Sequence, residues 1–183
     1  MGDKYERELV NTLEAVGIPA MRAPSSGSAT ERELPDVIAG MAIDQATIAD
    51  QLGATLPNSV SDEAITNASE MLSPKSDIYA IESKSQKGTT MYVESSEVAK
   101  LEMFADTFGG KPRLAARFTE RRFPTEHFLI PPENARMTDE GNYGLPAADV
   151  EDRATEIVHP STSTQDPRIE ICETGEMFRA GGD

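Results

Sequence analysis

The chain of 183 residues has no tryptophan, and aromatic residues make up only 5% of it. Hydrophobic residues account for 38%, which suffices for one domain with a packed core but leaves part of the chain outside it. Because Cys172 is the single cysteine, an intramolecular disulfide is excluded. The sequence also lacks a signal segment and any apolar run long enough to cross a bilayer, so we expect a cytoplasmic protein.

Basic residues are scarce as well: 17 Lys and Arg face 32 Asp and Glu, which gives a net charge of −15 at pH 7. This balance argues at first against a nucleic-acid partner, because phosphate binding rests on Lys and Arg. The acid is unevenly distributed, however, since residues 41–77 and 133–183 are strongly acidic whereas residues 78–132 are close to neutral. The cations of this central segment, which DNA could contact, are Lys84, Lys87, Lys100, Lys111, Arg113, Arg117, Arg121 and Arg122.

Hydrophobic spacing predicts helices over 4–16 and 94–108. Short apolar runs predict strands at 18–22, 35–40, 77–85, 91–93, 112–118 and 126–130. This order of elements predicts an α/β domain, in which helices flank a mixed β-sheet.

Two segments do not fit this pattern. Residues 41–76 contain two helix-like stretches, about 46–54 and 62–72, and are interpreted as an insertion. Beyond Pro132 the chain is acidic and rich in Gly, Ser and Thr, with weak periodicity. We therefore predict a core over residues 1–132 and an acidic, partly disordered C-terminal extension over residues 133–183.

Two acids and a lysine stand at informative positions. Asp36 follows a proline at the start of an apolar strand, and Glu82 and Lys84 lie two apart in the strand IYAIESKS. Because side chains alternate along a strand, Glu82 and Lys84 should share one face, while Ser83 points to the other.

This set of residue types suits phosphodiester hydrolysis. Carboxylates can hold a hard divalent cation, the cation lowers the pKa of a bound water, and a lysine can orient that water or stabilise charge. On spacing alone, the alternative is a turn aspartate followed by an exposed ion pair of low energetic value. Glu6, on the apolar stripe of the first helix, is either a further member of the cluster or an acid favoured by the helix dipole.

Several segments resemble the archaeal Holliday junction resolvases, a family of the PD-(D/E)xK nuclease superfamily. They are YERELVNTLEAVGIPAMR, SSGS, PDVIAG, IYAIESKS and KLEMFADTFGGKPRLAARF. The resemblance implies a restriction-endonuclease-like fold and a metal-dependent endonuclease that cuts four-way DNA junctions in recombination and repair. It further implies Mg²⁺, or Mn²⁺, as cofactor and a homodimer that cuts two opposed strands.

The resemblance also implies roles for individual residues. The metal site it implies consists of Glu6, Asp36, Glu82 and the intervening Ser83, and the catalytic set adds Lys84 and the loop serine Ser26. The DNA contacts it implies are Arg7, Arg22, Ser25 and Lys87.

The chain departs from the family pattern in its insertion and in its acidic C-terminal segment. Two alternatives therefore stay open at this point: a related nuclease for other branched or damaged DNA, and an inactive relative that binds DNA or a partner protein. The presence of Glu6, Asp36, Glu82 and Lys84 together favours an enzyme.

The excess of acid predicts adaptation to high salt, the alternative being an ordinary acidic cytosolic protein. The Debye length falls from about 30 Å at 0.01 M salt to about 3 Å at 1 M, so salt screens the repulsion among the carboxylates and towards DNA. We expect the chain to be best folded and most active at high salt, as measured by circular dichroism and junction cleavage across a potassium chloride series. Highest activity and full folding at low salt would show that the acid serves another purpose, such as binding a basic partner.

Overall fold

The protein is described by a computed structural model, which covers residues 3–23, 34–41 and 77–172. The helices and strands, in chain order, are α1 (Asp3–Ala15), β1 (Ala20–Arg22), β2 (Val37–Met41), β3 (Asp77–Gln86), β4 (Thr90–Val93), α4 (Ser95–Phe108), β5 (Lys111–Phe118), β6 (His127–Ile130), η1 (Pro132–Asn134), β7 (Arg136–Met137), β8 (Tyr143–Pro146), α5 (Val150–Arg153), β9 (Glu156–His159) and β10 (Arg168–Ile171). None of the helices among these residues is long and apolar enough to span a membrane.

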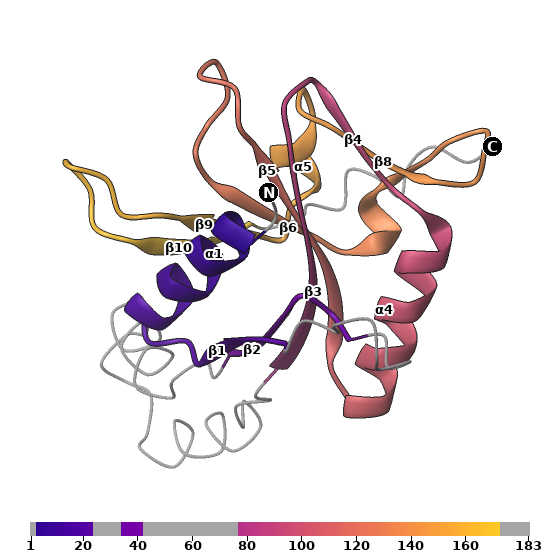
Figure 1. Ribbon diagram of the computed structural model, residues 1–183, viewed down its shortest axis with the longest axis horizontal. Coiled ribbons are helices and arrows are strands. Elements are labelled where there is room, and N and C mark those ends of the chain that lie inside the picture. The colour runs from indigo at the N-terminus through magenta and orange to yellow at the C-terminus, as the bar shows by residue number, and fades with distance from the viewer. Residues whose placement is uncertain (1–2, 24–33, 42–76, 173–183) are drawn as a thin grey trace, which may run out of the picture.

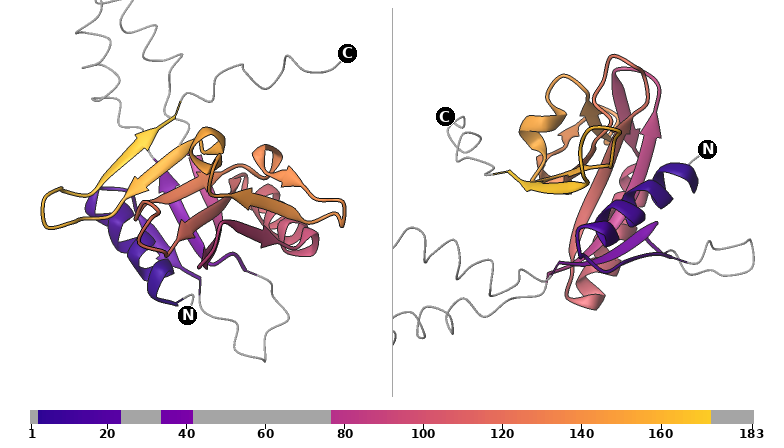
Figure 2. Two further views of the ribbon diagram at one scale, coloured as in Figure 1. Left: turned by 90° about the horizontal axis from the view of Figure 1, so that it is seen from above. Right: turned by 90° about the vertical axis from the view of Figure 1, so that its left-hand side faces the viewer.

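A curled sheet of seven strands, in the order β1-β2-β3-β5-β6-β9-β10, forms the centre of the molecule. Its strands β3 and β5 pair in parallel, and the other neighbours pair antiparallel, so the sheet is mixed as predicted. Strands β4, β8 and β7 form a separate three-stranded sheet. Helix α1 lies on one side of the main sheet and α4 on the other (Figures 1 and 2).

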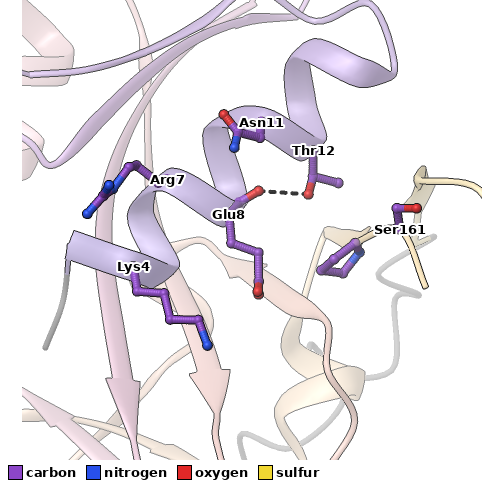
Figure 3. A pocket seen from close by; sticks show the side chains of 7 residues that line it. Lys4, Arg7, Glu8, Asn11, Thr12 and Ser161 are labelled. Atoms are coloured by element: carbon purple, nitrogen blue, oxygen red, sulfur yellow. Dashed lines mark hydrogen bonds between the residues drawn. The ribbon is translucent and has the colours of Figure 1, made fainter. Parts of the chain in front are cut away.

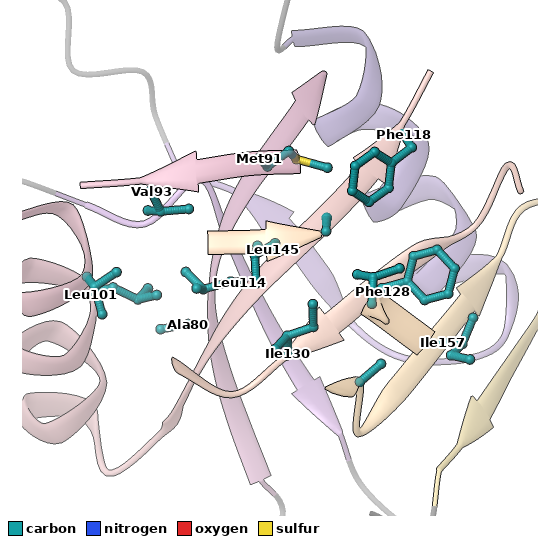
Figure 4. Packing of buried hydrophobic residues seen from close by; sticks show 14 of the residues in the cluster. Ala80, Met91, Val93, Leu101, Leu114, Phe118, Phe128, Ile130, Leu145 and Ile157 are labelled. Carbon is teal, nitrogen blue, oxygen red and sulfur yellow. The ribbon is translucent and has the colours of Figure 1, made fainter. Parts of the chain in front are cut away.

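Each face of the main sheet carries its own buried cluster, because successive side chains of a strand point to opposite faces. On one face, Leu9 and Leu13 of α1 pack against Ile81 of β3. On the other face, Leu101 of α4 packs into a cluster with Ala80 of β3 and residues of β5, β6 and β8 (Figure 4). Burying each of these leucines contributes roughly 1.5–3 kcal/mol, so both helices are held to the sheet by apolar contact.

Two glycines end helix α4 where the sequence predicts its end. Gly109 adopts a left-handed conformation, with φ of 66°, and its N–H donates to the carbonyl of Asp106. A Cβ on the following Gly110 would lie 2.8 Å from the carbonyl oxygen of Ile78, so only glycine allows this turn to approach β3 so closely.

The predicted boundary at Pro132 is wrong, since residues beyond it complete the same domain. Strand β9 pairs with β6 on one side and β10 on the other, within the main sheet. Leu145, Val150 and Ile157 are buried in the core on the α4 side. Short apolar runs between acidic residues are enough to fill an edge of the core. The acidic composition of residues 133–183 does not reveal these runs. The helices expected in the insertion and any disorder of residues 173–183 lie outside the described residues and stay predictions.

Two of the central cations are buried instead of available to DNA, which corrects the interpretation of the central segment. Arg113 donates from Nε to Glu156 at 2.9 Å, and the hydroxyl of Tyr79 donates to the same carboxylate at 3.1 Å. Arg117 donates from Nε to Glu8 at 3.1 Å, and both arginines are less than a tenth exposed. These pairs join β3, β5 and β9 to one another and α1 to β5.

Glu8 also contacts His127, a fully buried histidine, through Nε2 at 3.1 Å. Burial lowers the pKa of His127 below its ordinary value of 6.5, although the hydrogen bond and charge of Glu8 act in the opposite direction. Nδ1 of His127 is buried without a hydrogen-bond partner among the described residues. A neutral ring that donates from Nε2 fits this arrangement, because a carboxylate only accepts.

The buried histidine should make the stability depend on pH. The unfolded chain takes up a proton near pH 6.5 whereas the folded chain resists it, so stability is full above that pH and falls as the pH drops below it. Burial raises the pKa of Glu8, but its hydrogen bonds and charge interactions with His127 and Arg117 lower the pKa overall. Protonation of Glu8 therefore reduces the stability of the fold only below pH 4.5. Urea unfolding between about pH 7.5 and about pH 5 should show a shallower loss for His127→Gln than for the wild type. His159→Gln, which removes the other histidine, should keep the steeper loss; equal slopes for wild type and His127→Gln would contradict the assignment.

Candidate active site

Antiparallel pairing of β2 with β3 brings Asp36 beside Glu82. Val37 lies opposite Ile81 in the register, and the preceding Asp36 accepts a hydrogen bond at Oδ2 from the backbone N–H of Ser83 at 2.9 Å. This bond fixes the aspartate carboxylate against the strand that carries Glu82. The Pro-Asp and Glu-x-Lys motifs, which are far apart in sequence, thus meet at one place on the sheet.

Glu82 and Lys84 share the face towards α4, as the alternation predicts. Nζ of Lys84 lies 2.9 Å from Oε1 of Glu82 and 2.8 Å from Oε1 of Glu97. Glu97 comes from the first turn of α4 and was not singled out by the sequence analysis. The signal that could have found it is the spacing of Glu94 and Glu97 at the helix start, which is typical of a capping box and fixes where Glu97 lies.

The charges of the site act on one another. Burial raises the pKa of Glu82, and the nearby charge of Asp36 raises it further, against the lowering effect of Lys84. Burial by itself would lower the pKa of Lys84, but its hydrogen bonds to Glu97 and Glu82 outweigh burial and raise the pKa. Burial by itself would raise the pKa of Glu97, but the hydrogen bond and charge of Lys84, with smaller contributions from the N–H of Glu94 and from Lys100, together lower it. Lys84 is therefore held as an ammonium, which suits charge stabilisation better than proton abstraction.

The donor set fits a hard divalent cation in part. Asp36 and Glu82 offer carboxylate oxygens, the ligands that such ions prefer. Within residues 3–23, 34–41 and 77–172, no three side chains of His, Cys, Asp or Glu are grouped closely enough to hold a metal ion together. A cation here would thus complete its shell with water, as Mg²⁺ commonly does. The side chain of Ser83 is buried on the opposite face of β3, so this residue could join the site only through its main chain.

Glu6 is engaged elsewhere in this conformation. Its Oε2 accepts hydrogen bonds from Nη2 of Arg22 at 2.9 Å and from Nε at 3.2 Å. The structure therefore brings a predicted metal ligand and a predicted DNA contact together as an ion pair, which joins α1 to β1. It does not group Glu6 with Asp36 and Glu82.

The remaining predicted DNA contacts are dispersed. Arg7 is exposed on α1 and lines an open groove of about 540 Å³ between this helix and the segment after β9. Figure 3 shows Lys4, Arg7 and Asn11 on the helix and Ser161 on the segment opposite. Lys87 is exposed in the turn between β3 and β4. Ser25 and Ser26 lie outside the described residues, so their predicted roles are untested.

Comparisons with known proteins agree with this geometry. The sequence model of the family described as archaeal Holliday junction resolvase (hjc) matches residues 1–48 and 71–159. The unmatched residues 49–70 lie within the predicted insertion, whereas the match beyond Pro132 includes β7, β8 and β9. Strand β10 lies beyond the matched residues.

Among solved structures, the chain is similar to Hjc from Archaeoglobus fulgidus, described as a Holliday junction resolvase from an archaeal hyperthermophile. The TM-score is 0.53 and the sequence identity 21%, and the match covers 80% of this chain and 89% of that one. At this identity the likeness shows the fold: a curled mixed sheet flanked by helices. No curated protein sequence matches the chain significantly.

Proposed function

Since the chain belongs to the archaeal Holliday junction resolvase family, we propose that Asp36 and Glu82 bind Mg²⁺, or Mn²⁺, for its phosphodiester hydrolysis. The enzyme is an endonuclease that resolves Holliday junctions. The observation that carries the metal proposal is the proximity of two carboxylates, close enough for the charge of Asp36 to raise the pKa of Glu82. Such a concentration of negative charge, half-buried, is stabilised when a divalent cation shares it.

Each residue of the site has a distinct part in the proposed reaction. When bound, the cation lowers the pKa of a water molecule and neutralises charge that develops on the phosphate. The N–H of Ser83 orients Asp36, so this carboxylate need not change its position when a cation binds. Lys84 supplies a fixed positive charge to the scissile phosphate, consistent with its raised pKa. The ion pair of Glu6 with Arg22 orients the arginine at the end of β1.

We assign the DNA contacts to exposed cations and not to the buried arginines. Lys4 and Arg7 line the groove on α1, and Lys87 follows the strand that carries the catalytic pair. Phosphates bind such side chains irrespective of base sequence, which suits recognition of DNA shape. We place the reaction in the cytoplasm, where an archaeal enzyme would meet its DNA.

The enzyme is further proposed to act as a homodimer. One site cuts one strand, whereas resolution of a four-way junction needs two opposed cuts, which a two-fold pair of sites provides. The exposed face of α4 offers an apolar surface for a second copy. Met103 is 65% exposed, Phe108 is 56% exposed, and the ring of Phe108 stacks on Phe104 at 4.5 Å between centroids.

Removal of one carboxylate should abolish cleavage without abolishing binding. Asp36→Asn keeps the shape of the side chain but loses the charge that holds the cation, so the single-turnover rate should fall on the order of 10²-fold or more. Junction binding in EDTA should persist, since phosphates are held by other residues. The assay compares labelled four-way junction, flap and linear duplex, each with and without magnesium.

Asp139→Asn, which removes an exposed aspartate of the same kind, is the matched control and should cleave like the wild type. If Asp36→Asn cuts junctions at the wild-type rate, the metal site is assigned to the wrong residues. Preferential cutting of the flap would instead point to other branched DNA as the favoured substrate.

A charge on the α4 face should separate the copies. Phe108→Glu places a carboxylate in the proposed apolar contact, so light scattering at high salt should give half the wild-type mass, and cleavage should yield single nicks in place of paired cuts. Ile171→Glu alters an equally exposed apolar residue on β10 and should leave the mass unchanged. A wild-type monomer, or a Phe108→Glu protein of wild-type mass, would rule out this interface.

A further inference from the structure

We infer that Glu97 is a positioning residue, which holds the catalytic ammonium of Lys84 in place from the N-terminal turn of α4. This inference rests on the proposed function, because Lys84 matters only if it acts on the scissile phosphate. Glu97 lies outside the Pro-Asp and Glu-x-Lys motifs. It belongs to α4, the helix that follows β4 in the sequence.

The two carboxylate oxygens of Glu97 accept hydrogen bonds from different donors. Oε1 accepts a hydrogen bond from Nζ of Lys84 at 2.8 Å, and Oε2 accepts one from the backbone N–H of Glu94 at 3.2 Å. The second bond belongs to the capping box of α4 and restrains the carboxylate independently of its contact with Lys84. Helix α4 in turn is fixed to the sheet by Val98 and Leu101, which are buried. Glu97 is thus a rigid anchor with one oxygen turned towards the lysine.

The charge balance explains why a second anchor is needed. Lys84 also contacts Glu82, but Glu82 is the residue that would share its charge with a divalent cation. With a cation bound, Glu82 would attract the ammonium of Lys84 less strongly, because its negative charge would be shared with that ion. Glu97 supplies a negative charge on the other side of Nζ, so the lysine keeps its position when the cation is present. Asp36, Glu82 and Glu97 together carry three negative charges against one on Lys84, which leaves a net charge that matches one divalent ion.

Glu97→Gln tests this role, because glutamine can still cap the helix but no longer attracts the ammonium. The single-turnover rate at saturating enzyme should fall on the order of 10- to 100-fold, as when a catalytic group is displaced by about 1 Å. Affinity for the junction in EDTA and for Mg²⁺ by calorimetry should stay at the wild-type value, and so should the melting temperature. Glu94→Gln, which perturbs the same capping box without touching Lys84, is the matched control and should cleave like the wild type.

A double-mutant cycle distinguishes positioning from a direct role. Lys84→Ala should cut on the order of 10²-fold more slowly than the wild type. In that background, Glu97→Gln should cause no further loss, because a residue that acts only through Lys84 has nothing left to position.

Two results would overturn the inference. Wild-type cleavage by Glu97→Gln would show that Glu82 alone holds the lysine. A further rate loss in the Lys84→Ala background, or a weakened affinity for Mg²⁺, would make Glu97 a ligand or a substrate contact. Failure of the proposed function itself has a different signature, since Asp36→Asn would then retain cleavage whatever Glu97 does.

Discussion

Strand β3 sets the arrangement of the whole molecule, because it is central, long and different on its two faces. It pairs antiparallel with β2 and parallel with β5, so it joins the N-terminal and central parts of the chain. Tyr79 and Ile81 serve the core under α1, while Ala80 belongs to the core under α4. Beyond these apolar residues the same alternation delivers Glu82 and Lys84 to the α4 side. A shift of the register by one residue would exchange the two faces and dismantle both the core and the site.

Several of the Lys and Arg side chains form ion pairs within the fold. Arg113 and Arg117 are buried against Glu156 and Glu8, and Lys84 is held between two carboxylates. Buried pairs add little net stability, but the loss of one partner leaves the other charged and desolvated, which is costly. The charge of the chain therefore cannot be judged from its sum. Much of the basic charge is structural, and DNA meets only the exposed remainder.

Much of the fold up to Ile130 could be predicted because strong local patterns coincide with its elements. Helix α4 and strand β3 lie within a residue or two of their predicted bounds, and Asp36, Glu82 and Lys84 fall in motifs whose spacing has a chemical meaning. Strand β9 was missed because it begins with Glu156 and has only two apolar residues, and it is Arg113, distant in sequence, that makes this acid suitable for the interior. The ion pair of Glu6 with Arg22 was missed for the same reason, because the sequence does not show which residue will lie beside which. Without that knowledge, Glu6 was predicted to bind metal and Arg22 to bind DNA.

Contacts between residues far apart in the sequence affect how the chain can acquire this structure. Glu8 binds Arg117, 109 positions away, and His127, 119 positions away, and Tyr79 binds Glu156 across 77 positions. Such pairings close long loops, and folding slows as the sequence separation of contacts increases. During synthesis, Glu8 of α1 meets Arg117 and His127 only after β5 and β6 have been made. The sheet gains β9 later still, so the buried cluster under α1 is complete only when Val158 of β9 joins Leu9 and Leu13.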